Sequence, residues 1–253
     1  MPQNFRQTEI LDIARYEKKV VVEELAERLG VTVQTIRRDL SDLTDEGKLE
    51  RVHGGAILPS TVSNIGYEDR QSLNEGAKVD IAKRCAREIP DNSSLFMNIG
   101  TSTEAVAREL LKHNNLTVIT NNMNVANILV ANESCDIKVA GGTLRRSDGG
   151  LIGDLTIQVI EQFKVDFAVI GTSSMDHDGD LLDFDLQEVR VSKAIIKQAR
   201  KTYLVTDASK LKRNAPVRIA SLSEIDAIFT DKLPSDLRMK CEAWDTKVYE
   251  TSK

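Results

Sequence analysis

The chain has 253 residues, of which 41% are hydrophobic and 29% charged, a composition typical of globular proteins. Its net charge of −5 gives no bulk attraction for nucleic acid, and no apolar run approaches the roughly 20 residues that a membrane-spanning helix needs. The first residues also lack the apolar core of a signal peptide, so we expect a cytoplasmic protein without membrane contact.

Metal and disulfide chemistry have little support in the sequence. The three cysteines and three histidines are scattered, which excludes a disulfide framework and argues against a zinc site. Asp176, Asp178 and Asp180 alternate as in a calcium loop, but the glycine and glutamate that such a loop needs are replaced by Leu181 and Gln187. We therefore expect a polar turn there, no metal and no cofactor.

The first 58 residues predict three short helices followed by a hairpin. The apolar stripes of the helices are, in chain order, Ile10, Leu11 and Ala14; Val22, Leu25, Ala26 and Leu29; and Ile36, Leu40 and Leu43. Gly30 is placed to end the second helix, and Thr32 to cap the third. A turn at 46–48, a strand at 49–52 and a glycine-rich turn at 53–55 then predict a two-stranded wing.

The pattern changes twice in the rest of the chain. Residues 59–74 contain Pro59, three serines and no apolar period, which is typical of a linker. After them strands alternate with helices; the strands are expected at 95–99, 116–120, 137–140, 167–170, 203–206 and 228–230, with a helix ending at Pro90 and others at 103–111, 123–130, 156–163 and 188–199. This alternation predicts an α/β domain with a mostly parallel sheet flanked by helices.

The third helix presents polar side chains opposite its apolar stripe, namely Gln34, Thr35, Arg37 and Arg38. The first turns of a recognition helix reach base edges in the major groove, where arginine binds guanine and glutamine binds adenine. Which of the four contact bases and which contact phosphates stays open. Thr32 at the helix start and Lys48, Arg51 and His53 on the wing complete the candidate DNA-binding residues.

Charge within the first 60 residues argues against this interpretation. Nine basic residues stand against eleven acidic ones, a net charge of −2. The acidic residues near the third helix come after the arginines, so the start of the helix can still be locally positive; they are Asp39, Asp42, Asp45 and Glu46. The alternative is a three-helix packing unit with a solvated polar face.

Small polar residues follow three successive strands of the second part. They are Gly100, Thr101, Ser102 and Thr103 after the first, Asn121 and Asn122 after the second, and Gly141 and Gly142 after the third. Free N–H groups at a helix start bind anions, and open α/β sheets bind ligands at their carboxyl edge, which predicts a phosphate-binding pocket. Asp185 could hold a ligand hydroxyl and Lys210 a phosphate, although a surface ion pair is an equal alternative for each. The alternative for the whole set is ordinary turns.

Residues 33–40, VQTIRRDL, followed by HGGA at 53–56, resemble the winged helix-turn-helix of DeoR-type transcriptional repressors. The chain departs from this family where many members place serine or threonine before the second helix, because Val21 and Val22 stand there. Loss of such a cap destabilises a helix by about 1 kcal/mol, so we expect this helix to depend on tertiary packing.

The second part resembles the effector domain of the same family, through residues 99–111, 120–129, 140–153, 184–190 and 205–214. This resemblance implies a winged helix-turn-helix at 3–58, a linker at 59–74 and an effector-binding and oligomerisation domain of the ribose-5-phosphate isomerase fold at 75–253. It also implies a homodimeric or homotetrameric repressor that binds double-stranded, palindromic operator DNA and is released by a phosphorylated inducer, glycerol 3-phosphate or a related sugar phosphate.

An enzyme of the isomerase fold is the main alternative. Isomerases of this fold carry a glycine-rich loop with a lysine and acids for proton transfer. Residues 182–189 read LDFDLQEV and contain neither the glycines nor the lysine. We therefore expect no catalytic residues. A purely structural protein is the weakest alternative, since it leaves the arginines of the third helix without a role.

Overall fold

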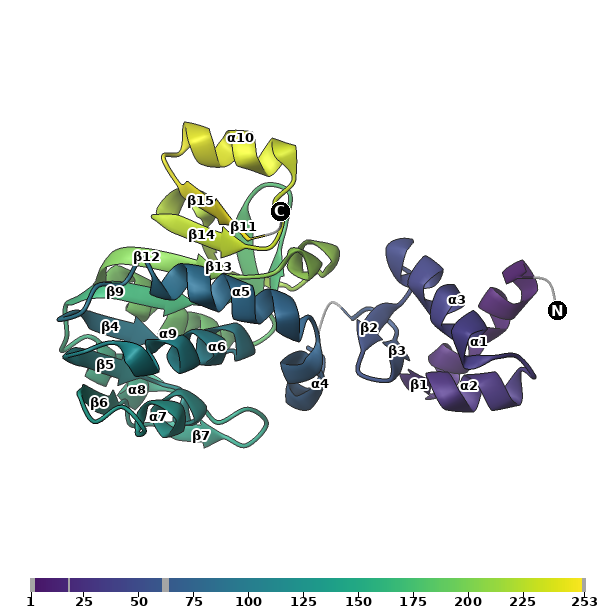
Figure 1. Ribbon diagram of the computed structural model, residues 1–253, viewed down its shortest axis with the longest axis horizontal. Coiled ribbons are helices and arrows are strands. Elements are labelled where there is room, and N and C mark those ends of the chain that lie inside the picture. The colour runs from purple at the N-terminus through teal and green to yellow at the C-terminus, as the bar shows by residue number, and fades with distance from the viewer. Residues whose placement is uncertain (1–2, 18, 61–63, 252–253) are drawn as a thin grey trace. The chain divides into compact units, whose positions relative to one another are not determined.

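A computed structural model describes residues 3–17, 19–60 and 64–251. The chain divides into two compact units, Met1–Leu73 and Asn74–Lys253, whose elements are labelled in Figure 1. Each unit has its own hydrophobic core, and each is described separately below.

The N-terminal unit contains the three predicted helices and the predicted wing. Its elements are α1 (Gln3–Glu17), β1 (Lys19–Val21), α2 (Val22–Arg28), α3 (Val33–Asp45), β2 (Glu50–Val52), β3 (Gly55–Ile57) and α4 (Tyr67–Ser72). The predicted stripes form its core, in which Ile10, Ile36 and Leu40 are completely buried. The wing has three strands in the order β1-β3-β2, because β1 pairs antiparallel with β3.

Strand β1 explains how α2 begins without a side-chain cap. Val21 at the cap position makes no capping hydrogen bond. The N–H of Val22 instead donates to the carbonyl of Gly54 in the wing turn, at 2.9 Å. Next to this turn, a Cβ on Gly55 would lie 1.8 Å from the carbonyl oxygen of Val20, so only glycine fits the position. As expected, the start of α2 depends on tertiary contacts, and the wing supplies them.

The segment expected as a linker is partly helical. Helix α4 occupies Tyr67–Ser72, and the Lys19 amino group lies 3.4 Å from the Asp69 carboxylate. Residues 61–63 of the same segment lie outside the described residues.

The C-terminal unit is built on a wholly parallel seven-stranded sheet of order β15-β14-β12-β9-β4-β5-β6. These strands are β4 (Ser94–Met97), β5 (Leu116–Thr120), β6 (Cys135–Val139), β9 (Val165–Ile170), β12 (Ala199–Val205), β14 (Ala227–Thr230) and β15 (Lys247–Glu250). The helices are α5 (Glu75–Ala86), α6 (Thr101–Glu109), α7 (Met123–Leu129), α8 (Asp154–Ile160), α9 (Leu186–Lys197) and α10 (Ser235–Ala243), with short 3-10 turns at Leu110–Lys112, Ala208–Lys212 and Leu222–Glu224.

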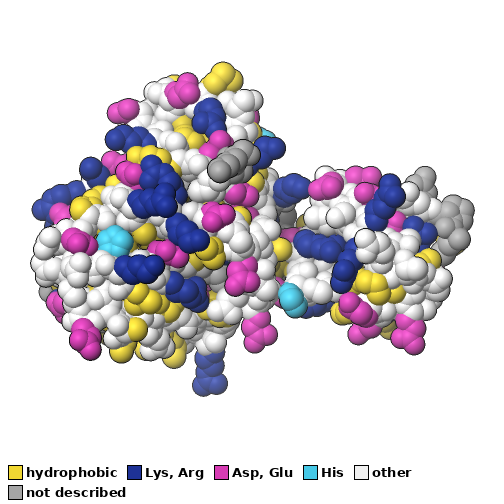
Figure 2. Space-filling view, in the orientation of Figure 1, with side chains coloured by type: hydrophobic (Ala, Val, Ile, Leu, Met, Phe, Trp, Pro, Cys, Tyr) yellow, Lys and Arg dark blue, Asp and Glu magenta, His cyan; other side chains and the backbone are white. Residues whose placement is uncertain are grey.

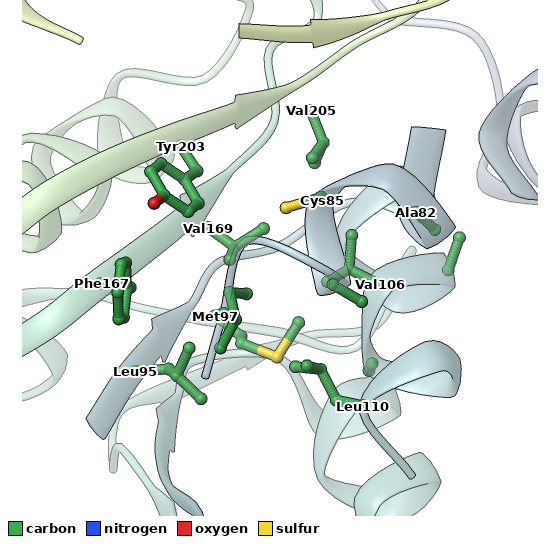
Figure 3. Packing of buried hydrophobic residues seen from close by; sticks show 14 of the residues in the cluster. Ala82, Cys85, Leu95, Met97, Val106, Leu110, Phe167, Val169, Tyr203 and Val205 are labelled. Carbon is green, nitrogen blue, oxygen red and sulfur yellow. The ribbon is translucent and has the colours of Figure 1, made fainter. Parts of the chain in front are cut away.

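Helices cover both faces of the sheet, as predicted. Helices α5, α6 and α7 enclose one apolar cluster, and α8, α9 and α10 enclose the other. In Figure 3, Met97 and Val169 of the sheet lie close to Cys85 and Val106 of the helices that cover the first face. The sheet therefore leaves its strand ends, rather than its faces, open to ligands.

Two smaller sheets, two helices and two further strands were not predicted. A hairpin joins β7 (Thr143–Arg145) to β8 (Gly150–Ile152), and an antiparallel sheet joins β10 (Ser174–Met175), β11 (Asp180–Asp183) and β13 (Val217–Ser221). The expected polar turn lies between β10 and β11, where Gly179 has a φ of +90°. The helices missed by the prediction are α10 and, in the segment expected as a linker, α4; the strands β1 and β15 were missed as well.

Candidate DNA-binding and effector sites

The start of α3 is organised by two threonines. Thr32 lies at the N-cap, where its hydroxyl accepts a hydrogen bond from the Thr35 N–H at 3.2 Å. The two hydroxyl oxygens lie 2.9 Å apart. A capped first turn holds the following side chains in defined directions. Thr35 is accordingly half-buried and less available than its neighbours.

Three of the predicted reading residues project into solvent. Gln34, Arg37 and Arg38 are exposed, whereas Ile36 on the opposite side is completely buried. Among the residues that the structure describes, no ion pair involves either arginine. Side chains held this way by a rigid helix are available for a partner outside the chain.

Arg51 of β2 adds a positive charge beside this surface. Burial lowers the pKa of Arg51, and the charge of Arg37 lowers it further. Its Nη1 atom is buried and makes no hydrogen bond within the described residues. A desolvated guanidinium beside a second one, with a donor to spare, is stabilised by an anion such as a phosphate. Figure 2 shows lysine and arginine side chains grouped near a histidine on the visible face of this unit.

Two acidic residues of α3, Asp39 and Asp42, have partners within the N-terminal unit. Asp39 is only 1% exposed and forms a two-point ion pair with Arg6, with 2.9 Å between Arg6 Nη2 and Asp39 Oδ1. Asp42 accepts a hydrogen bond from Gln3 at 2.8 Å. Asp39 thus stabilises α3 from inside, so its charge does not lie among the exposed arginines of this helix.

The wing residues differ in their surroundings. Lys48 lies 2.6 Å from Glu46 in an exposed ion pair, which is weak in water. His53 and Gly54 form the exposed turn between β2 and β3. Among the basic residues of the wing, Arg51 is thus distinguished by a buried Nη1 donor without a partner in the described residues.

In the C-terminal unit, the loop after β4 leads directly into α6. Gly100 has a φ of +145° and a backbone that side chains rarely adopt. The Thr103 hydroxyl donates to the carbonyls of Asn98 and Gly100, at 2.8 and 2.7 Å, and so closes the loop from inside. The first N–H groups of a helix have no partner within the helix, and here they start at this loop. Helix starts of this kind can bind anions, so the predicted phosphate site at this loop stays a prediction.

The loop after β5 lies beside the first one. Asn122 caps α7 by accepting from the Asn124 N–H at 2.9 Å, and its amide donates to the buried Glu104 of α6 at 3.3 Å. The Asn121 amide donates to the carbonyl of Leu151, which ties the β7–β8 hairpin to this loop. The Asn121 Oδ1 atom is buried and has no partner within the described part of the chain. Two of the three predicted loops are therefore brought together.

The third loop has a different environment. Gly141 accepts a hydrogen bond from the Thr156 hydroxyl of α8 at 2.6 Å. A Cβ on Gly142 would lie 2.0 Å from the same hydroxyl oxygen. These two glycines allow the chain to pass close to α8. Packing against α8 is therefore a structural reason for glycine here, beside the predicted role in ligand binding.

Sequence reasoning missed Arg145, which joins the β7–β8 hairpin to the start of α9. Its guanidinium lies 2.7 Å from Asp148 of the hairpin and 2.8 and 2.6 Å from Asp185 and Glu188 at the start of α9. Asp185 also caps α9 by accepting from the N–H of Gln187 at 2.8 Å. Asp185, predicted to hold a ligand hydroxyl, is thus already engaged in an ion network.

The network has more acids than bases, with consequences for its titration. Burial, reinforced by the charge of Asp183, raises the pKa of Glu188 to about 8 even though Arg145 opposes the shift. Burial also raises the pKa of Asp183. Burial thus favours the protonated form of Glu188, whereas Arg145 favours the charged form.

The loop after β12 carries Lys210 and Asp207, both buried. Burial alone would raise the pKa of Asp207, but the charge of Lys210 and hydrogen bonds from Ser209 and Asn74 outweigh it and lower the pKa. Asn74 donates to Asp207 at 2.8 Å although the two are 133 residues apart. The hydroxyl oxygens of Thr206 and Ser209 are buried and lack partners within the described residues. Such atoms suit a bound polar ligand.

Within the described residues, neither a metal-binding cluster nor a membrane-spanning helix is present. No group of three or more histidine, cysteine, aspartate or glutamate side chains is arranged to hold a metal ion. No described helix is long and apolar enough to cross a membrane.

Comparison with known proteins identifies both units. Residues 6–62 match the DeoR-like helix-turn-helix domain, and residues 73–232 match the DeoR C terminal sensor domain. The chain belongs to the DeoR family of DNA-binding transcriptional regulators. This family is non-enzymatic, in agreement with the prediction that the chain has no catalytic residues.

Individual relatives match almost the whole chain. A glycerol-3-phosphate regulon repressor of Escherichia coli (strain K12) is 46% identical over 92% of this chain and 93% of its own. Another of the same name, from Haemophilus influenzae, is 45% identical over 94% and 92%. The HTH-type transcriptional repressor CsqR of Escherichia coli is 38% identical over 91% and 88%.

Among solved structures, ribose 5 phosphate isomerase A from Neisseria gonorrhoeae is similar with a TM-score of 0.41. The match has 11% identity and covers 56% of this chain and 54% of the other.

Proposed function

We propose that this regulator represses genes of glycerol 3-phosphate metabolism and that glycerol 3-phosphate releases it from its operator. The observation that carries the DNA-binding half is the desolvated Arg51 beside the unpaired Arg37, next to an exposed Gln34 and Arg38. Relatives that are 46% and 45% identical and named for the glycerol-3-phosphate regulon support the effector half.

On the DNA, Gln34, Arg37 and Arg38 enter the major groove and contribute most of the sequence preference. The predicted contacts to the DNA backbone come from Thr32, Thr35, Lys48, Arg51 and His53. We assign DNA binding to residues 3–58, the connection to 59–74 and effector binding with self-association to 75–253.

In the effector domain, the phosphate binds the N–H groups of Gly100, Thr101, Ser102 and Thr103. Asn121, Asn122, Gly141 and Gly142 line the neighbouring strand ends. Lys210 provides a positive charge and Asp185 accepts from a ligand hydroxyl. The chain acts as a homodimer or homotetramer on a palindromic operator, since two-fold symmetry of the protein matches two-fold symmetry of the site.

An operator titration tests the switch. Glycerol 3-phosphate should weaken operator binding about 5- to 150-fold per coupled site, the range of typical allosteric coupling. Because linkage is reciprocal, operator DNA must weaken effector binding by the same factor. Equal effector affinity with and without operator rules out the mechanism. A larger thermal shift with another phosphorylated metabolite of three to six carbons reassigns the effector but leaves the repressor intact.

Thr101→Glu tests the anion site. A carboxylate at the start of α6 is compatible with the helix but occupies the place of the phosphate. The variant should bind operator normally and no longer release it, whereas the matched control Thr101→Ser keeps the hydroxyl and the response. An unchanged response in Thr101→Glu removes this loop from the site.

A further inference from the structure

Strand β6 forms an open edge of the seven-stranded sheet. Within the described residues it pairs with β5 and with no strand on its other side. The side chains of Asp136 and Lys138 are 61% and 41% exposed, and they pair with each other along the strand. Val139 is 43% exposed. An uncovered edge strand of this kind is a template for pairing with another chain.

The opposite edge, β15, is engaged within its own unit. The Glu250 carboxylate pairs with Arg238 of α10 and accepts from the Leu233 N–H at 2.7 Å. The Tyr249 hydroxyl donates to Glu88 of the α5 region at 3.1 Å. Among the described residues, charges on β6 have partners only on the same strand, so the two edges differ in what they can offer a partner.

The hydrogen bonds that flank β6 define which of its backbone groups face outward. The Ala140 N–H donates to the Thr120 carbonyl at 2.9 Å, and the Ser134 carbonyl accepts from the Leu116 N–H at 3.3 Å. Backbone groups alternate in direction along a strand, so the even-numbered residues of β6 face β5. The odd-numbered residues therefore direct their N–H and C=O groups to solvent.

Those outward residues are Cys135, Ile137 and Val139. The N–H of Cys135 donates to Asn132 at 3.1 Å, which leaves its carbonyl for a partner. Ile137 and Val139 have both groups available to a strand laid along the edge. Cys135 and Ile137 pack against the apolar cluster beneath α7, so the edge is held firmly in place.

We propose that two copies of this chain associate edge to edge through β6, in antiparallel orientation, with Ile137 opposite its own counterpart. In this register Ile137 exchanges both backbone hydrogen bonds with Ile137 of the second copy. Cys135 faces Val139, and Asp136 faces Lys138, twice over because of the two-fold axis. The sheets of the two copies become continuous.

Charge and backbone direction together select this register. Outward-facing residues can pair only with outward-facing residues, so the register shifts in steps of two. A shift in one direction puts Asp136 opposite Asp136, and a shift in the other puts Lys138 opposite Lys138; like charges directly opposite are destabilising. Self-complementarity of this kind points to a second copy of the chain rather than to an unrelated strand. The inference deepens the self-association within the proposed function by naming its surface.

Sedimentation velocity without DNA tests the surface on the full-length protein. Asp136→Lys and Lys138→Asp each place like charges opposite each other and should raise the dissociation constant roughly tenfold. The double variant Asp136→Lys/Lys138→Asp restores opposite charges and should recover wild-type association. Val139→Pro removes an outward N–H that β5 does not use and should also favour the smaller species.

Lys247→Asp on β15 is the matched control, since it makes the same charge change on the other edge, and it should leave association unchanged. The inference is overturned if the wild type is monomeric at all concentrations, if the single variants associate normally, or if the double variant is no better than the singles. Normal operator binding in that case leaves the proposed function standing. Conversely, the swap pattern without any operator binding supports the surface and rejects the function.

Discussion

The surface proposed to read DNA and the sheet edge proposed to bind the effector differ in how their polar side chains are held. Gln34, Arg37 and Arg38 are exposed, and the two arginines have no ion-pair partner within the described residues. Thr103 and Asn122, by contrast, are buried and hydrogen-bonded inside the effector unit. Function and folding can therefore be separated by mutation in the first region but overlap in the second.

This difference suits the two partners. DNA is a large polyanion that approaches the protein from outside, so exposed lysine and arginine side chains are sufficient to bind its phosphates. The small ligand proposed for the sheet edge would instead share groups that already hold loops and helices together. On this proposal, binding would exchange internal partners and so favour a different arrangement of those loops.

The largest expected effect concerns Asp39, the acidic neighbour of the reading arginines. Breaking the buried pair with Arg6 by Asp39→Ala leaves a desolvated charge and should lower the free energy of unfolding of the N-terminal unit by about 3–5 kcal/mol. Urea denaturation measures it. Asp42→Ala is the control, because its hydrogen bond to Gln3 is exposed and should contribute under about 1 kcal/mol. If the two variants lowered the free energy of unfolding equally, the pair between Asp39 and Arg6 would not stabilise the unit as expected.

The next effect concerns pH and the effector unit. Because the pKa of Glu188 is raised from 4.5 to about 8, the folded state holds this proton more tightly than the unfolded state. Its contribution is then fully present below about pH 4.5 and is lost as pH rises through about 8. Relative to Glu188→Gln, the wild type should lose roughly 2–4 kcal/mol of stability across that window. Chemical denaturation from pH 4.5 to 9 checks this, with the exposed Glu161→Gln as control; parallel curves for wild type and Glu188→Gln would contradict it.

An intermediate effect is expected on operator affinity, because the exposed arginines of α3 can be replaced without disturbing the fold. Arg37→Ala and Arg38→Ala should each weaken operator binding by about 1–3 kcal/mol without changing thermal unfolding or effector affinity. Arg15→Ala, an exposed arginine of α1 paired with Asp12, should leave operator affinity unchanged. Fluorescence anisotropy with labelled operator measures all three. Wild-type affinity in both α3 variants would mean that the reading face lies elsewhere.

The smallest effect concerns the junction between the regions. Asn74 is the first residue of the C-terminal unit, has a φ of +54° and holds Asp207 beside Lys210. Asn74→Gly is compatible with the left-handed backbone at this position but removes the hydrogen bond to Asp207. Effector and operator affinities measured separately should stay close to wild type, while their mutual coupling falls by about 1 kcal/mol. Asn115→Gly, at another left-handed asparagine, is the control. Unchanged coupling would show that this contact does not connect the effector loop to the junction.

The sequence was sufficient where structure is local. The stripe Ile36, Leu40 and Leu43 and the cap Thr32 lie within one helix, so periodicity and capping rules predict α3 and its exposed face. Six of the seven parallel strands contain short apolar runs and were predicted, although β12 begins four residues earlier than expected; the seventh strand, β15, was missed because its residues alternate polar with apolar. The family's motifs then extended these local predictions to fold and function.

What was missed depends on distant partners. Arg145 gains its role from Asp185 and Glu188, which are 40 and 43 residues away. The buried pairing of Asp39 was not predicted, because its partner Arg6 lies 33 residues earlier. Strand β1 exists only because β3 pairs with it. None of these contacts leaves a periodic mark in the sequence.

The hydrogen bond from Val22 to Gly54 has a consequence for building chimeric regulators. It joins the start of the helix-turn-helix to the tip of the wing, so the two are a single transplantable module. A graft of α3 and the wing alone would pair the wing with a β1 from the other regulator. The hydrogen bond between the Gly54 carbonyl and the first N–H of α2 would then join residues that are not matched to each other. Exchange of operator preference between relatives should therefore move residues 19–57 together.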